Sequence, residues 1–160
     1  MNSGLVLLDN TVLTNFALIG RSDLVLSLWG ANCATTTAVA AEYDVGVAGR
    51  RLPADLWQNL KQLTLSSDEK AAAALMSPRL GAGERTCIAS AVHRQGLLVT
   101  DDADAPAEAQ RRNVPITGTV GILVLNVRRG NLTLSEGNEL LSDMIAQGYR
   151  SPVSALDALI

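Results

Sequence analysis

Two short, mainly apolar runs that lead into aspartates constrain the fold of this chain more than any other feature. Leu5–Leu8 runs directly into Asp9, and Leu97–Thr100 runs into Asp101 and Asp102. A short run without polar alternation is typical of a strand that is buried on both faces of a parallel sheet. The sequence therefore predicts a parallel sheet with acids at the ends of two of its strands.

The rest of the chain alternates between strand and helix patterns. Further strands are expected at Cys33–Thr36, Lys61–Leu65 and Val114–Ile116, the last at an edge of the sheet because of Pro115. Helices are expected at Thr11–Ile19, Arg21–Trp29, Thr37–Val47, 66–76, 81–95, a segment with Pro106 in its first turn, Thr119–Arg129, Ser135–Gln147 and Ser151–Ile160, with 49–60 as an irregular connection. Such alternation predicts one three-layer α/β domain over residues 1–160, with about four or five short strands between helices.

Composition narrows the class of protein. Hydrophobic residues make up 48% and charged residues 18%, which is ordinary for a soluble globular domain. The net charge of -3 argues against a broad basic surface for nucleic acid. No apolar run approaches the roughly 18 residues of a membrane span, and the start of the chain lacks the basic region of a signal peptide. We therefore expect a soluble, cytoplasmic protein.

The two cysteines and the single histidine do not indicate a metal centre. Cys33, Cys87 and His93 have none of the spacings of a zinc site. The cysteines either form a bridge or remain free thiols, and free thiols fit a reducing cytosol better. His93, well inside a predicted helix, is expected at the surface or at the edge of the core.

The strand-end aspartates have two interpretations. Asp9 and Asp101 either cap the helices that follow them, since aspartate is a favoured N-cap, or they converge on a ligand. In an open parallel sheet, ligands bind beyond the carboxyl ends of the strands where the winding direction reverses. Two such acids on adjacent central strands favour convergence.

Two glutamates near helix starts extend this set. Glu42 lies in an Ala- and Val-rich stretch, where it either faces solvent or is buried with a cation or another partner. Glu84 follows Gly81-Ala82-Gly83, whose glycines allow a ligand to approach the backbone closely, or it is simply a first-turn acid favoured by the helix dipole. The glycine patterns that cradle phosphates are absent. A carboxylate cluster without a convergent lysine suits Mg²⁺ or Mn²⁺; its members are Asp9, Glu42, Glu84, Asp101 and Asp102.

The ordered set of motifs resembles the PIN-domain ribonucleases, which include the VapC toxins of bacterial toxin–antitoxin pairs. It is most similar to a subgroup with a Gly-x-Gly-Glu helix start and a tail that reads Gly-Thr-Val/Leu-Gly-x-Leu. The matching segments are Leu8–Thr11, Ala41-Glu42, Gly81–Glu84, Leu98–Asp102 and Val114–Leu123. They span nearly the whole chain in the family's order. Members of this subgroup often carry an arginine soon after the last acids, where this chain has Pro106.

The resemblance implies a set of site residues. Asp9 would be the first metal ligand, with the Thr11 hydroxyl close to the attacking water, Glu42 the second ligand and Glu84 the third. Asp101 or Asp102 would be the fourth, and Asp104 is a further candidate. The Thr-x-Asp form of many PIN domains favours Asp102 as the fourth ligand. Asp101 is favoured instead by its own position directly at the end of the strand.

The resemblance also implies an activity and partners. The activity is a divalent-metal-dependent endoribonuclease, in which Mg²⁺ or Mn²⁺ activates water and the product carries a 5′-phosphate. The partners are an RNA substrate, an antitoxin protein if the chain is a toxin, and a second copy in a homodimer. The alternative is a PIN-like module that binds RNA or protein without cutting.

Two pairs of arginines could also contact RNA. They are Arg111–Arg112 and Arg128–Arg129, which either bind RNA phosphates or simply lie at helix C-termini, where cations are favoured.

Overall fold

The computed structural model describes residues 4–160, in which five parallel strands form one sheet. The strands are β1 (Val6–Leu8), β2 (Cys33–Thr36), β3 (Lys61–Leu63), β4 (Leu97–Val99) and β5 (Ile116–Thr117). The α-helices are α1 (Asn10–Leu18), α2 (Asp23–Trp29), α3 (Thr37–Ala48), α4 (Ser67–Ala74), α5 (Ala82–Arg94), α6 (Ala105–Arg111), α7 (Thr119–Arg128) and α8 (Leu134–Ala146), and the 3₁₀ turns are η1 (Gly30–Asn32) and η2 (Asp157–Leu159). The predicted α/β architecture is confirmed.

The strand order, β3-β2-β1-β4-β5, places a reversal of winding beside β1. The chain first adds β2 and β3 on one side of β1, and then returns to add β4 and β5 on the other. In the parallel pair of β1 and β4, Leu8 lies opposite Val99. The backbone N–H of Asp9 donates to the Val99 carbonyl at 2.9 Å. The segments that follow β1 and β4 therefore leave the sheet side by side, at the kind of position where α/β folds bind ligands.

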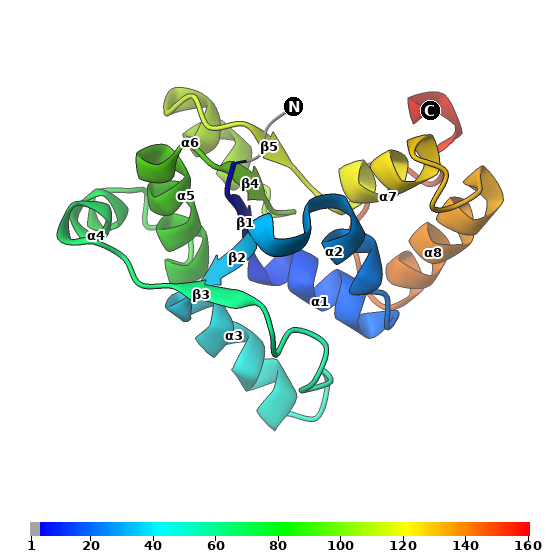
Figure 1. Ribbon diagram of the computed structural model, residues 1–160, viewed down its shortest axis with the longest axis horizontal. Helices are drawn as coiled ribbons and strands as arrows, with labels where there is room; N and C mark the ends of the chain where they lie inside the picture. The colour runs from blue at the N-terminus through cyan, green and yellow to red at the C-terminus, as the bar shows by residue number, and fades with distance from the viewer. Residues whose placement is uncertain (1–3) are drawn as a thin grey trace.

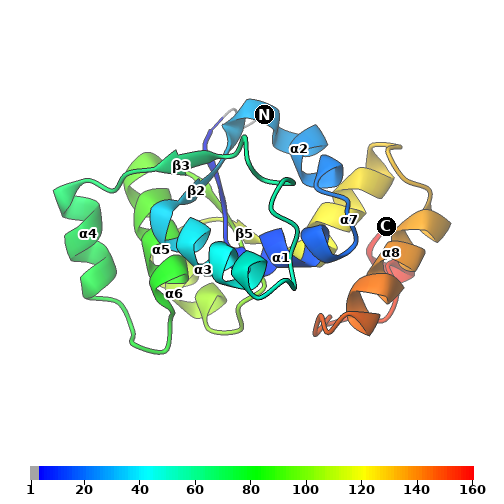
Figure 2. The ribbon, with the colours of Figure 1, turned by 90° about the horizontal axis from the view of Figure 1, so that it is seen from below.

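Helices cover both faces of the sheet (Figure 1). Helix α5 packs on β1, β2 and β4, and it carries α4 and α6 on its outer side. Helices α1, α2, α7 and α8 form the opposite layer (Figure 2). Helix α3 contacts α1 as well as α5 and so lies against both layers. These are the three layers expected from the sequence.

The core follows from the apolar strand residues. Leu7, Leu8 and Leu98 are almost wholly buried between Phe16 of α1 and Ile88 of α5. Burial of each such side chain contributes about 1.5–3 kcal/mol. Because β1 and β4 are buried on both faces, a polar residue at either strand end lies at the boundary between this core and solvent.

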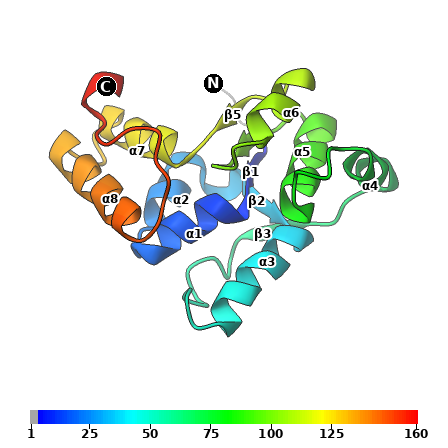
Figure 3. The same cartoon turned by 180° about the vertical axis from the view of Figure 1, so that it is seen from behind.

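The last predicted helix, Ser151–Ile160, is wrong. Only Asp157–Leu159 forms a single 3₁₀ turn, and the rest of the tail passes back along α8 toward α7 (Figure 3). The Leu156 N–H donates to Asn138 Oδ1 at 2.7 Å, and the fully buried Leu156 side chain packs over Gly137. Tertiary packing on α8 thus replaces the local hydrogen bonds of a helix.

The starts of two elements have clear local causes. A capping box marks the start of α4: Ser66 Oγ accepts from the Glu69 N–H, and the Glu69 carboxylate accepts from the Ser66 N–H. The edge strand β5 begins after Pro115, which has no N–H to donate. Pro115 still contributes its carbonyl, which accepts from the Leu98 N–H at 2.9 Å.

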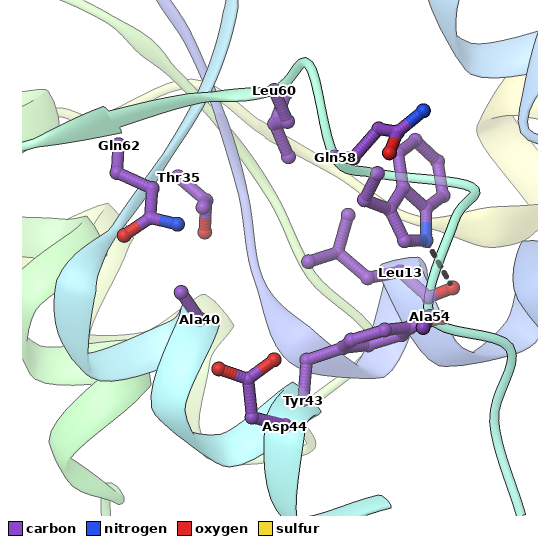
Figure 4. Close-up of a pocket in the computed structure, with 10 residues that line it drawn as sticks. Leu13, Thr35, Ala40, Tyr43, Asp44, Ala54, Gln58, Leu60 and Gln62 are labelled. Atoms are coloured by element: carbon purple, nitrogen blue, oxygen red, sulfur yellow. Dashed lines mark hydrogen bonds between the residues drawn. The ribbon is translucent and has the colours of Figure 1, made fainter. Parts of the chain in front are cut away.

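The irregular connection 49–60 folds over α1 and α3. Trp57 Nε1 donates to the Leu13 carbonyl at 3.1 Å, and the Tyr43 hydroxyl donates to the Pro53 carbonyl at 2.8 Å. A cavity of about 110 Å³ remains beneath it, beside Asp44 (Figure 4). None of the predicted site residues lines this cavity, so it is separate from the strand-end acids.

Other expectations concern membranes and thiols. Across residues 4–160, none of the helices combines the length and apolarity that a membrane crossing requires. Cys33 and Cys87 are both free and both buried. Burial raises the pKa of the Cys33 thiol to about 11, so this group stays protonated at neutral pH.

Candidate active site

Asp9 is the innermost acid of the site. It follows β1 directly, and its side chain is fully buried. Although Asp9 occupies the N-cap position of α1, its carboxylate makes no capping hydrogen bond. Within residues 4–160, its Oδ1 has no hydrogen-bond partner. An unpaired buried carboxylate oxygen is costly, and no capping hydrogen bond offsets that cost here. Helix capping therefore does not explain why an aspartate is buried at this position.

Two threonines hold the other oxygen of Asp9. Thr100 Oγ1 donates to Oδ2 at 2.7 Å from the end of β4, and Thr11 Oγ1 donates to it at 3.3 Å from α1. Thr11 Oγ1 also accepts from the Asp101 N–H at 2.9 Å. This network fixes the Asp9 carboxylate so that Oδ1 alone remains available. Burial raises the pKa of Asp9, hydrogen bonds from Thr100 and from the Asn10 backbone oppose that shift, and the nearby charge of Glu42 adds to it.

Asp101 is bound to the protein through both of its carboxylate oxygens. Oδ1 accepts from the Thr119 N–H at 2.8 Å and from the Tyr149 hydroxyl at 3.4 Å. Oδ2 accepts from Asn15 Nδ2 at 3.0 Å and from the Thr119 hydroxyl. Asp101 therefore caps α7, a helix that begins 18 residues later, rather than the helix that follows it.

Asp102 and Asp104 face different surroundings. Asp102 is half-buried, and its charge acts on Glu84 across the site. Its Oδ1 accepts from the Asp104 N–H at 2.7 Å, which closes a tight turn. Asp104 itself is exposed, and its side chain makes no hydrogen bond or ion pair with any residue of the described part of the chain. Of the three candidates for the fourth acid, Asp102 combines a free carboxylate oxygen with proximity to the other acids.

The Gly-Ala-Gly-Glu motif brings Glu42 and Glu84 together. The Gly83 N–H donates to Glu42 Oε1 at 2.9 Å, and a Cβ at Gly83 would lie 2.7 Å from Glu42 Oε2. A Cβ at Gly81 would lie 2.6 Å from Glu84 Oε2. Each glycine thus leaves room for one carboxylate. The two glycines were expected to let a ligand approach the backbone closely. The groups that approach it in the structure are the carboxylates of Glu42 and Glu84.

A pair of threonines aligns the two helices that carry these glutamates. Thr36 Oγ1 accepts from the Val39 N–H at 3.3 Å and so caps α3. The same hydroxyl lies 2.8 Å from the hydroxyl of Thr86 on α5, which donates to the Gly83 carbonyl at 2.8 Å. Since both helix starts are tied to each other, the Glu42–Gly83 contact does not depend on the glutamate alone.

The electrostatics identify Asp9, Glu42, Glu84 and Asp102 as one cluster, called the acid cluster below. Partial burial raises the pKa of Glu84 to about 7, and the charges of Asp9, Asp102 and Glu42 add to that rise. Within residues 4–160, no lysine or arginine forms an ion pair with any of the four. A group of acids in which the pKa values of Asp9 and Glu84 are raised, and with which no described lysine or arginine pairs, is a candidate for cation binding.

The donor set fits a hard divalent cation. Asp9 Oδ1 is buried without a partner, and carboxylate oxygens are the ligands that Mg²⁺ and Mn²⁺ prefer. The four residues that would hold such an ion are those of the acid cluster. One observation points the other way: among residues 4–160, no three His, Cys, Asp or Glu side chains are grouped closely enough to be recognised as a metal site.

Several residues of this site were not singled out from the sequence. Thr100, Thr119, Asn15 and Tyr149 hold Asp9 or Asp101, from which they are separated by 18 to 91 residues in the sequence. The one local signal was Thr100 itself, a polar residue at the end of an apolar strand. His93 bonds the Ala89 carbonyl of its own helix at 3.0 Å, as expected for a residue outside the site.

The predicted basic pairs are engaged within the protein. Arg111 and Arg112 both form ion pairs with the buried Glu108, at 3.0 and 3.1 Å. Arg128 donates to the Leu159 carbonyl and Arg129 to the Leu28 carbonyl. These contacts favour the helix-end interpretation over phosphate binding.

The fold and the site together define an α/β protein whose carboxylates gather where the winding of the parallel sheet reverses, beside β1. The chain belongs to the PIN-domain family, because a family model described as a PIN domain matches residues 5–160. No curated protein and no solved structure gives a significant match. PIN domains are generally nucleases and typically use divalent metals.

Proposed function

We propose that this protein is a divalent-metal-dependent endoribonuclease whose site is the acid cluster. The observation that carries the proposal is the environment of Asp9, a fully buried carboxylate. Among residues 4–160, one of its oxygens has no hydrogen-bond partner, and no lysine or arginine forms an ion pair with the acid cluster. Such a cluster is compensated by Mg²⁺ or Mn²⁺ more readily than by hydrogen bonds.

The roles of the residues follow from their contacts. Asp9, Glu42, Glu84 and Asp102 would hold the metal, which when bound lowers the pKa of a water and offsets charge on the phosphate. Thr100 and Thr11 keep the Asp9 carboxylate in one orientation. Asp101 fixes the start of α7 and the segment at Tyr149, and is a positioning residue in this proposal. Attack by water on phosphorus leaves a 5′-phosphate on the product.

Cleavage of RNA by the purified protein tests the proposal. Single-stranded RNA should be cut with Mg²⁺ or Mn²⁺ and left intact in EDTA. Asp9→Asn keeps the shape of the side chain but removes the charge, and it should lower the rate by about 100-fold or more, as expected when a metal is misplaced. Cleavage in EDTA, or full activity of Asp9→Asn, would contradict the proposal.

A second candidate is a PIN-like module that binds RNA or protein without cutting. It is favoured by the lack of a closely grouped metal site among residues 4–160. The two candidates differ in metal affinity. If the acid cluster binds Mn²⁺, saturation at 100 times the Kd raises the free energy of unfolding by about 2.7 kcal/mol, and Asp9→Asn should reduce that rise. A melting temperature that is unchanged by millimolar Mn²⁺ would favour the second candidate.

We extend the proposal to the setting in which such an enzyme works. The protein would act in the cytoplasm as a homodimer, and as the toxin of a toxin–antitoxin pair it would be blocked by an antitoxin covering the acid cluster. The homodimer and the antitoxin rest on the resemblance to VapC toxins alone, and the cytoplasmic location rests on the sequence pattern and the thiols described above. A small DNA-binding protein encoded beside this chain, and inhibition of cleavage by that protein, would support the toxin assignment; cleavage that its presence leaves unchanged would contradict it.

A further inference from the structure

Two cavities border the acid cluster. One, of about 530 Å³, is lined by Glu42 together with Arg51. The other, of about 360 Å³, is lined by Asp102 together with Arg150. Glu42 and Asp102 both act on the charge of Glu84, so the acid cluster links the two cavities. Each cavity is of a size that takes a small ligand, such as one nucleotide.

The same stretch of chain borders both cavities. Gln147, just after α8, lines the cavity of Arg51, and Tyr149 lines the cavity of Arg150. The segment that follows α8 therefore connects the two cavities.

Arg51 and Arg150 are available to bind an anion. Both are exposed, and neither side chain makes a hydrogen bond or ion pair with any residue between 4 and 160. Among residues 4–160, the side chains of Arg50, Arg79 and Arg85 also lack such a bond, but they line neither cavity. Arg51 and Arg150 differ from them because each shares a cavity with an acid that it does not pair with. This arrangement suits a ligand whose anionic groups bind the arginines and that binds together with a cation for the acids.

The backbone around each arginine is fixed. The Arg51 N–H donates to the Gly46 carbonyl at 3.0 Å, which ties it to the end of α3. On the other side, the Tyr149 hydroxyl holds Asp101, and Ser151 bonds the Val153 carbonyl at 2.6 Å and the Val153 N–H at 3.2 Å. Arg150 is thus presented from a segment that is anchored before and after it.

We propose, building on the nuclease function above, that Arg51 and Arg150 bind the phosphates on the two sides of the scissile phosphate of a single RNA strand. The strand enters one cavity, crosses the acid cluster and leaves through the other. A guanidinium suits this role because it binds phosphate oxygens in a bidentate manner. The strand is single because each cavity takes a nucleotide without its pairing partner.

Binding of a short fluorescent single-stranded RNA tests this path. The measurement uses the full chain with Asp9→Asn, so that the strand is not cut, with Mg²⁺ and over a range of salt concentrations. Arg51→Gln and Arg150→Gln should each weaken binding about tenfold and reduce the salt slope of log K by about 0.7, and the double variant should lose about twice that slope. In the wild-type background, each should raise KM for cleavage and leave kcat nearly unchanged.

Two controls carry the same change of charge outside the cavities. Arg50→Gln alters the exposed neighbour of Arg51, and Lys70→Gln alters α4, at the end of the molecule opposite α8 (Figure 1). Both should bind RNA like the parent. If the arginine variants match these controls, or if the parent binds no RNA, the path is wrong, even where the wild type cuts RNA. If the slopes fall as expected but the wild type cuts nothing, the path stands and the nuclease function is wrong. Duplex RNA that competes as well as the single strand would overturn the single-strand assignment.

Discussion

Thr100 Oγ1 donates a 2.7 Å hydrogen bond to Asp9 Oδ2 and so joins the end of β4 to the end of β1 across the centre of the sheet. The bond holds one oxygen of this buried carboxylate, whereas the other oxygen has no hydrogen-bond partner among residues 4–160. The same bond explains how two segments that are 91 residues apart share one site.

The two adjacent aspartates after β4 should respond differently to substitution. Asp101→Asn disturbs the bonds with Thr119, Asn15 and Tyr149, and should lower the free energy of unfolding by about 2 kcal/mol, as expected for charge-assisted hydrogen bonds. Asp102→Asn should leave stability nearly unchanged and abolish metal-dependent cleavage. Urea unfolding and a cleavage assay on both variants check this. A stable, inactive Asp101→Asn beside an active Asp102→Asn would reverse the assignment of the fourth acid.

Gly83 should matter for activity more than for stability. In Gly83→Ala the new Cβ would lie 2.7 Å from Glu42 Oε2, and the flexible end of Glu42 can move away at little energetic cost. Displacement of a ligand by about 1 Å costs on the order of 100-fold in rate, so cleavage should fall strongly while the melting temperature changes little. Gly49→Ala is the matched control, because its Cβ would meet nothing closer than 3.4 Å. Equal activities of the two variants would show that the position of Glu42 is not critical.

The metal-free protein should lose stability as pH rises from about 4.5 to about 7. The folded-state pKa of Glu84 is raised from 4.5 to about 7, so its contribution is fully present below 4.5 and is lost as the pH passes through the folded value. A shift of this size corresponds to about 3 kcal/mol at most, and solvent screening of a half-buried group reduces it to roughly 1 kcal/mol.

Unfolding in EDTA at several pH values measures this effect. Glu84→Gln should be more stable than the wild type at pH 8, and the two should be equally stable at pH 4. A difference that does not vary with pH would mean that Glu84 does not titrate in this range.

Acid should weaken the contact between α4 and α5. The buried Glu69 accepts from Arg94 Nε at 2.8 Å and Nη2 at 2.9 Å, and these bonds lower its pKa from 4.5 to about 2. Its contribution to stability is therefore present above pH 4.5 and is lost as the pH falls toward 2. Glu69→Gln should cost about 2–3 kcal/mol at pH 7 and much less at pH 2.5.

An exposed ion pair provides the comparison for Glu69. Arg21 and Asp23 lie 3.0 Å apart, and their side chains are 36% and 63% exposed. Asp23→Asn should change the free energy of unfolding by less than about 0.5 kcal/mol. Thermal melts of Glu69→Gln and Asp23→Asn at pH 7 and pH 2.5 show whether burial of the acid, rather than ion pairing alone, accounts for its contribution to stability.

Local patterns in the sequence determined the elements of this protein and the identity of its acids. The apolar runs before Asp9 and Asp101 predict β1 and β4 because burial on both faces excludes polar side chains from a strand. Gly81-Ala82-Gly83 correctly marks the start of α5 beside Glu84. Each of these signals acts over a few residues, where hydrophobicity and capping report directly on secondary structure.

The tertiary structure alone decided how those acids differ. Asp101 and Asp102 are neighbours in sequence, but only Asp101 reaches Thr119 and Tyr149, because the start of α7 and the segment after α8 come to the residue that follows β4. The last ten residues carry a helical pattern, yet Leu156 packs on α8 instead, because burial of its side chain outweighs a weak local preference. Arg150 likewise comes to the acids through the path of the chain after α8. Contacts of this kind depend on the order of the strands and the packing of the layers, which no short stretch of sequence encodes.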